Sequence, residues 1–212
     1  MPAALDDGAG TKGHGHIATT GGSGTTFTAK VTVERHSGGE VGKISGGTFD
    51  GEVVNQGEID GGTFHAKVSN GEPGSNSSVG AITGGTFTGE VTNNVGSTIS
   101  GGTFHGAVTN IGTINNGTFA GTVTNKTDGA QSSGGGGNAG TIHDGTFTGT
   151  VTNDKDCTIS GGTFNKAVIN SGMITGGSFE GEITGNGNVN FTDSSTPVYT
   201  VRFMADEQEY ET

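Results

Sequence analysis

The sequence predicts an all-β protein, a parallel β-solenoid (β-helix) of about nine coils on a fifteen-residue repeat. Three observations predict this fold. Large apolar residues recur at fixed positions of the repeat, glycine pairs separate them, and the insertions fall at one point of the repeat. A single coil cannot bury its own apolar side chains, so such a unit must stack on copies of itself.

The repeat emerges when the chain is aligned on the phenylalanines of its Thr-Phe pairs, the last of which is Ser-Phe. An Ile lies five residues before the Phe, a β-branched aliphatic residue four residues after it, and an Asn two residues further on. The unit is G-x-I-x-G-G-T-F-x-G-x-V-x-N-x. Stacking such units places like residues in columns along the rod.

Four columns result. The Phe column contains Phe27, Phe49, Phe64, Phe87, Phe104, Phe119, Phe147, Phe164 and Phe179. The Ile column contains Ile44, Ile59, Ile82, Ile99, Ile114, Ile142, Ile159 and Ile174. The Val column contains Val31, Val53, Val68, Val91, Val108, Val123, Val151, Val168 and Ile183. The Asn column contains Asn55, Asn70, Asn93, Asn110, Asn125, Asn153 and Asn170.

Successive phenylalanines are 22, 15, 23, 17, 15, 28, 17 and 15 residues apart, so fifteen is the minimum. Every excess lies between the position of the Asn and the next Ile. One corner of the coil is therefore predicted to accept loops while the others do not. A disordered glycine-rich chain, which the composition alone would allow, gives no reason for insertions to gather in this way.

Fifteen residues divide into three sides, G-x-I-x-G, G-T-F-x-G and x-V-x-N-x, with one large apolar residue pointing inward from each. Corners are expected at glycines, which reach the positive φ that tight turns require. Coils should lie ~4.8 Å apart. A flattened, two-sided coil with Thr-Phe-x-Gly-x-Val as one strand stays open, although it would place Lys166 in the core. The Asn column is expected to form an internal or corner amide ladder.

Composition excludes several classes of function. The chain has only nine Lys and Arg residues and a formal net charge of -12, which argues against nucleic acid as a partner. No apolar run approaches the ~20 residues of a membrane span. The single cysteine excludes an internal disulfide framework. Residues 1–7 lack the features of a signal peptide, so a secreted form would be an excised piece or a mature chain with an added Met.

The repeats define three segments. We expect residues 1–25 to be a flexible leader or an N-terminal cap, and residues 26–191 to form the β-solenoid, closed by Phe191. Residues 192–212 read as a linker plus a partial C-terminal strand or the start of a next module. The insertion from Lys126 to Asn138 contains four consecutive glycines and is expected to be mobile.

Two stretches resemble known families. The segment Tyr199-Thr-Val-Arg-Phe203 resembles the first strand of the small β-grasp repeats of Listeria and Bacteroides surface proteins. The fifteen-residue units resemble the β-helical repeats of large cell-surface proteins of gut and Gram-positive bacteria. These resemblances imply an extracellular location, on the bacterial cell surface or secreted, and a role as a stalk or adhesin.

Candidate ligand-binding residues lie in the second and third repeats. Asp50 is one coil from His65, and Glu52 is one coil from Lys67, so the four form a small polar patch that could bind a sugar or a cation. The alternative is an ordinary solvated face with alternating charge. Carboxylates do not stack in the column after Phe, so we predict no catalytic residues, no enzyme activity and no cofactor.

Metal and thiol chemistry are not expected. His14 and His16 form the one close histidine pair, and His65 and His105 lie two coils apart, ~9.6 Å by the strand spacing, too far to share one ion. Cys157 occupies a small-residue position seven before Phe164, where other repeats have Gly or Ser. Asp154 and Asp156 flank Lys155 in a two-residue insertion that reads as a turn.

Threonine columns raise a further alternative, an ice-binding solenoid. A second Thr follows Phe only at Thr28, Thr88 and Thr148, so this array is interrupted, and outward strand residues that hydrogen-bond to their neighbours account for it.

The sequence thus favours a non-catalytic structural or adhesive β-solenoid that displays loops from one corner (residues 34–41, 71–78 and 126–138). The alternatives are a carbohydrate-binding or carbohydrate-active β-helix and an ice-binding solenoid. Expected partners are a surface glycan or protein of a host or microbe, and uncapped ends would allow end-to-end self-association.

Overall fold

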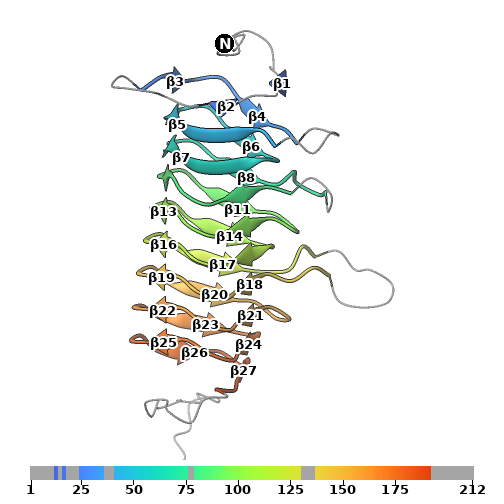
Figure 1. The fold of residues 1–212 in the computed structure, drawn as a ribbon. Helices are drawn as coiled ribbons and strands as arrows, with labels where there is room; N and C mark the ends of the chain where they lie inside the picture. The colour runs from blue at the N-terminus through green and yellow to red at the C-terminus, as the bar shows by residue number, and fades with distance from the viewer. Residues whose placement is uncertain are drawn as a thin grey trace, which may run out of the picture.

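The computed structural model describes residues 12–13, 16–17, 24–35, 41–75, 79–129 and 137–191. These residues form 27 short strands and no helix, and the strands pair in parallel, which confirms the predicted β-solenoid. The coils stack into one column, with the chain winding from one end to the other (Figure 1). None of the described residues belongs to a helix long and apolar enough to cross a lipid bilayer.

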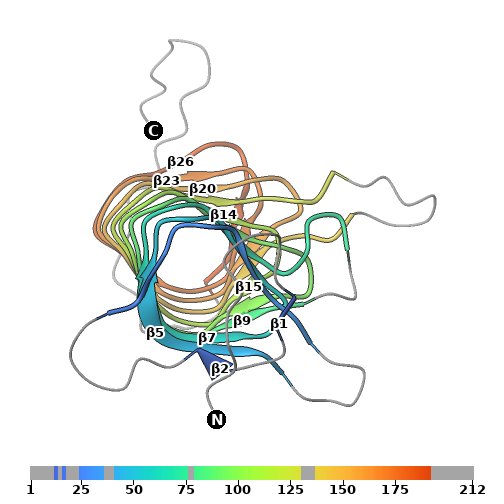
Figure 2. The same ribbon diagram turned by 90° about the horizontal axis from the view of Figure 1, so that it is seen from above.

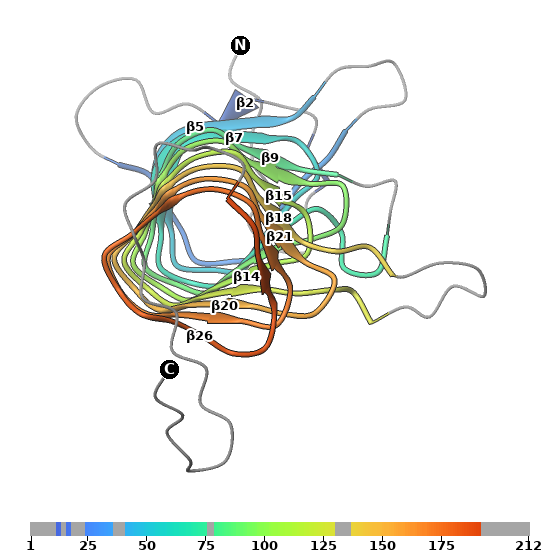
Figure 3. The same cartoon turned by 90° about the horizontal axis from the view of Figure 1, so that it is seen from below.

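Each coil contributes a strand segment to each of three sides, seen end-on in Figures 2 and 3. The Ile side consists of β2 (His16–Ile17), β9 (Ala81–Ile82), β12 (Thr98–Ile99), β15 (Thr113–Ile114), β18 (Thr141–Ile142), β21 (Thr158–Ile159), β24 (Met173–Ile174) and β27 (Asn188–Val189). The Phe side consists of β3 (Thr26–Phe27), β10 (Thr86–Phe87), β13 (Thr103–Phe104), β16 (Thr118–Phe119), β19 (Thr146–Phe147), β22 (Thr163–Phe164) and β25 (Ser178–Phe179). Strands β5 (Lys43–Phe49) and β7 (Glu58–Phe64) run through both sides.

The Val side is a separate ten-stranded sheet. It consists of β1 (Lys12–Gly13), β4 (Val31–Val33), β6 (Val53–Asn55), β8 (Val68–Asn70), β11 (Val91–Asn93), β14 (Val108–Asn110), β17 (Val123–Asn125), β20 (Val151–Asn153), β23 (Val168–Asn170) and β26 (Ile183–Thr184).

Like residues stack on like residues along the whole column, as the repeat predicts. Parallel pairing is in register, so that Phe87 aligns with Phe104 and Val91 with Val108. Successive Phe rings from Phe27 to Phe179 lie 4.7–4.8 Å apart between centroids and nearly parallel. The Ile and Val columns pack beside this stack to form one continuous core. Phe191 ends the stack with a ring tilted by 56° at 6.0 Å from Phe179.

Each coil has three sides, in contrast to the flattened, two-sided alternative. The strand breaks between the Phe and Val sides, where the two-sided alternative required one long strand, and Lys166 at this break is exposed. The Ile and Phe sides instead belong to one 17-stranded sheet, because β5 and β7 continue through the corner between them.

Glycine serves two purposes at the corners. The second glycine of each pair, such as Gly102 (φ 103°), has a positive φ at the bend between the Ile and Phe sides. The glycine two residues after Phe has no such φ, but a Cβ on Gly106 would overlap the carbonyl oxygen of Gly89 in the preceding coil. Glycine therefore acts for the predicted reason only at the first of these corners. At the second corner it permits close approach of successive coils, and Ala29, Ala66 and Lys166 replace it in three of the coils.

The Asn column forms the predicted amide ladder. Each Nδ2 donates to the Oδ1 of the next Asn at 2.7–2.8 Å, without interruption from Asn55 to Asn170. All seven side chains are buried. Further bonds from Nδ2 to backbone carbonyls, such as Asn70 to Thr98, satisfy the second proton.

Strand pairing extends into the segment expected to be a leader or a cap, since β1 pairs with β4 and β2 pairs with β5. The backbone of Ile17 aligns with that of Ile44, so the strands of the Ile side begin at β2, ten residues before Phe27 instead of the usual five. Residues 192–212, including the Tyr199–Phe203 segment, lie outside the described residues, as does His14.

Candidate functional site

The insertions between successive Phe residues leave the column at the corner between the Val side and the Ile side, directly after the position of the Asn column, which Val33 occupies in the first coil (Figures 2 and 3). The bases of two loops are held by antiparallel bridges, Arg35 with Val41 and Thr127 with Ala139. At the longer loop the Asp128 amide donates to the Asn138 carbonyl at 3.0 Å, and the Asn138 Nδ2 donates to the Asp128 Oδ2 at 2.8 Å. Residues 36–40, 76–78 and 130–136 of these loops lie outside the described part of the chain.

The ladder continues beneath the loops without a break. Asn125 lies just before the longest insertion, and its Nδ2 donates both to the Asn153 Oδ1 (2.8 Å) and to the carbonyl of Gly140 on the far side of that insertion (3.0 Å). The Lys126 amide donates to the Asn110 carbonyl (2.9 Å), which keeps the start of the loop in the ladder. Buried amides therefore close the coil whatever length of chain is inserted.

The two-residue insertions form tight turns, as predicted for Asp154–Asp156. The Cys157 amide donates to the Asp154 carbonyl at 3.1 Å, and Ser97 makes the equivalent bond to Asn94 at 3.0 Å. Cys157 is fully buried at the same position as Ser97, and burial raises the pKa of its thiol to about 11. Cys157 thus serves as a small buried residue, and its thiol is unreactive at neutral pH.

The predicted polar patch is assembled only in part. His65 Nδ1 lies 2.7 Å from Asp50 Oδ1, and both side chains are about half exposed (50% and 46%). Glu52 pairs with Lys30 of the preceding coil at 3.6 Å between Nζ and Oε2. Lys67 is exposed in the coil that follows Glu52. The patch is an open surface where a hydroxyl-rich ligand could displace water. Exposed ion pairs of this kind contribute little to the stability of the fold.

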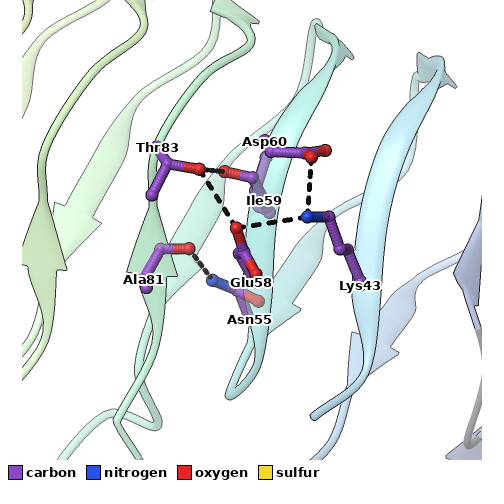
Figure 4. A network of polar contacts seen from close by, with 7 residues as sticks. All are labelled: Lys43, Asn55, Glu58, Ile59, Asp60, Ala81 and Thr83. Carbon is purple, nitrogen blue, oxygen red and sulfur yellow. Dashed lines mark hydrogen bonds and ion pairs between the residues drawn. The ribbon is translucent and has the colours of Figure 1, made fainter.

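A second polar cluster, on the Ile side of the same coils, involves Lys43, Glu58 and Asp60 (Figure 4). Lys43 Nζ lies 2.7 Å from Asp60 Oδ2 and 3.3 Å from Glu58 Oε1, and the Thr83 hydroxyl donates to Glu58 Oε1 at 3.3 Å. The hydrogen bond to Asp60 raises the pKa of Lys43, and the same bond lowers the pKa of Asp60.

This cluster was missed by the sequence analysis, although its signal was present. Lys43 and Glu58 directly precede the Ile of successive repeats, which places opposite charges one coil apart. The Lys43 ammonium pairs with both carboxylates and partly neutralises their charge. The cluster therefore has little negative charge left to attract a cation. In the described segments no three His, Cys, Asp or Glu side chains are placed to share a metal ion.

Threonine columns occur on all three sides of the middle coils. On the Val side Thr92, Thr109, Thr124 and Thr152 align in register. On the Ile side Thr98, Thr113, Thr141 and Thr158 do the same. On the Phe side Thr precedes the Phe from Thr26 to Thr163. The threonines therefore form one column on each side, and no side of the middle coils carries the doubled T-x-T array of the ice-binding alternative without interruption.

Comparison of the chain with models of known protein families, with curated proteins and with solved structures found no match.

Proposed function

We propose that this chain is a non-catalytic structural and adhesive segment of an extracellular bacterial surface protein, a stiff rod that displays recognition loops from one corner. One observation carries the proposal. The loops of residues 34–41, 71–78 and 126–138 leave the same corner, and the Asn ladder is continuous beneath the second and third of them. Variable loops on an invariant scaffold are the usual way in which a rigid fold presents a binding surface.

Two features support a load-bearing scaffold. Each coil is joined to the next by three parallel ladders and by stacked Phe and Asn columns, so contacts are repeated evenly along the rod. The exposed positions of the middle coils are mainly Thr, Ser, Asn and His. The neighbouring carboxylates of Glu58 and Asp60 both pair with Lys43, which engages the acid groups that hydrolysis of a polysaccharide would use.

The loops themselves provide the test. Deleting residues 127–139 leaves Asn125-Lys126-Gly140-Thr141-Ile142, which has the same length as the loop-free corner Asn110-Ile111-Gly112-Thr113-Ile114. Beads coated with the intact chain or with this trimmed variant would be applied to arrays of glycans and of extracellular matrix proteins. Loss of binding with an unchanged circular dichroism spectrum is expected. Equal binding by both forms would contradict loop-based recognition.

Carbohydrate binding by the sides of the rod is the second candidate, because Asp50 and His65 form an exposed pair next to Glu52. Binding on the glycan array that survives loop trimming but disappears in Asp50→Ala would favour this candidate. Lys155→Ala, an exposed change on a distant coil, is the matched control. Release of sugars from a bound polysaccharide would contradict a non-catalytic role altogether.

A further inference from the structure

Asn116 stands where most repeats have the first glycine of the pair at the corner between the Ile and Phe sides. Its side chain is exposed, and Gly117 follows it with φ 140°. The Gly117 amide donates to the Asn116 Oδ1 at 2.7 Å. Because Oδ1 is bonded to Cγ, this contact holds the backbone nitrogen of Gly117 next to the carboxamide carbon of Asn116.

The chain contains two other Asn-Gly dipeptides, and their glycine amides are engaged differently. The Gly71 amide donates to the Asn55 carbonyl at 2.7 Å, and Asn70 is buried in the amide ladder. Asn186 is exposed, but the Gly187 amide donates to the Asn170 carbonyl at 2.9 Å. Among the described residues, Gly117 is the one glycine after Asn whose amide has no backbone acceptor.

We propose that Asn116 is a site of spontaneous covalent modification, deamidation through a cyclic imide. The Gly117 nitrogen loses its proton to solvent and forms a bond to Asn116 Cγ. The carboxamide C–N bond breaks, and ammonia leaves. Water then opens the five-membered imide at either carbonyl and gives aspartate or isoaspartate. Water is the only co-reactant, and glycine offers no Cβ to obstruct the attack.

The following coil shows that the aspartate product fits. Asp144 occupies the position equivalent to Asn116, and the Gly145 amide donates to its Oδ1 at 2.7 Å with φ 135°. Thr118 and Thr146 align in register, so positions 116 and 144 lie on successive coils. Deamidation therefore adds a second negative charge beside Asp144 on an otherwise uncharged stretch, since residues 91–125 contain no Asp, Glu, Lys or Arg.

The test uses the intact, folded protein, incubated in mildly alkaline buffer while its circular dichroism spectrum is monitored. Peptide mass spectrometry measures conversion at the three asparagines over time. Conversion should be at least roughly fivefold faster at Asn116 than at Asn186, the factor expected when one ordinary backbone hydrogen bond must first be broken. Asn70 should be the slowest. The Asn116→Gln variant should remove the corresponding acidic species from ion-exchange profiles.

A parallel incubation in concentrated urea separates structure from local sequence. In the unfolded chain the three dipeptides share the same local chemistry, and their rates should converge. Selectivity for Asn116 in the folded chain that disappears in urea supports the proposal. Conversion at Asn186 as fast as at Asn116 in the folded chain would overturn it, as would no conversion at Asn116 under conditions in which the unfolded chain reacts there.

Discussion

Asp156 is the one non-glycine residue with a positive φ (69°) in the part of the chain that the structure describes. It occupies the turn position that Gly96 (φ 74°) holds in the related turn three coils earlier. Asp tolerates this conformation better than most residues because its short polar side chain can hydrogen-bond locally. Compared with glycine, Asp156 is therefore slightly more strained in the folded turn, but it makes the unfolded chain less flexible.

We expect Asp156→Ala to lower the free energy of unfolding by about 1 kcal/mol, because alanine lacks that local polar contact at positive φ. Gly96→Ala should cost a similar amount. Asp156→Gly should change stability by less than about 0.5 kcal/mol, since relief of strain is offset by a more flexible unfolded chain. Urea unfolding measures all three, with Lys155→Ala as a neutral control. If Asp156→Ala were as stable as the unaltered protein, the positive φ at this turn would not restrict which residue can occupy position 156.

Cys157 gives the stability a pH dependence. Its thiol has a raised pKa of about 11 in the folded chain, against an ordinary value of 9.0. The folded state therefore retains its proton where the unfolded state has lost it, so the contribution is present below about pH 9 and is lost as the pH rises toward about 11.

Cys157→Ser provides the comparison, because Ser97 is buried at the equivalent position. The native protein should lose stability relative to this variant over that pH window in thermal unfolding. The thiol should react with a disulfide reagent only after unfolding. Rapid labelling of the folded protein at neutral pH would contradict the burial of Cys157.

At the scale of the element, the Asn ladder closes the loop-bearing corner. Replacing Asn110 with Ala would leave the Asn93 Nδ2 without its amide acceptor and the Asn125 Oδ1 without its donor, both in buried surroundings. Unsatisfied groups of this kind cost about 1 to 3 kcal/mol each. We expect Asn110→Ala to lower the free energy of unfolding by about 2 to 4 kcal/mol.

Thr109→Ala, the outward neighbour on the same strand, should cost less than about 0.5 kcal/mol. Urea titration measures both losses, and the slope of the unfolding free energy against urea concentration should not change. A larger loss in Asn110→Ala than in Thr109→Ala then assigns the effect to the ladder and not to β14 as a whole. Equal losses in the two variants would mean that the ladder contributes nothing beyond strand pairing.

The elements could be predicted because one residue type fills each inward position, so the spacing alone shows which side chains meet. The prediction failed where geometry is not periodic. Ile17 was not recognised because ten residues separate it from Phe27, and only its pairing with Ile44 reveals its place. Glu52 lies one coil from Lys67, as predicted, but its ion pair with Lys30 on the other adjacent coil was not foreseen, because a long side chain has neighbours on both adjacent coils and sequence does not choose between them.

At the scale of the whole molecule, the column behaves as a one-dimensional stack in which each coil contacts only its neighbours. This arrangement predicts that coils are interchangeable units. Deleting residues 100–114, one complete repeat, joins Ile99 to Asn115 and keeps every Ile, Phe, Val and Asn column in register. The shortened chain should fold, with its spectrum unchanged and its length reduced by ~4.8 Å in solution scattering.

The matched control deletes residues 101–114, one residue fewer. All later side chains in the adjoining coil are then displaced by one position, and in a strand such a slip turns inward residues to the surface. The Phe stack between Phe87 and Phe119 would be broken, and the ladder from Asn93 to Asn125 would lose its alignment. We expect this variant to unfold at much lower urea concentration or to aggregate. If both deletions fold equally well, stacking in register is not what holds the column together.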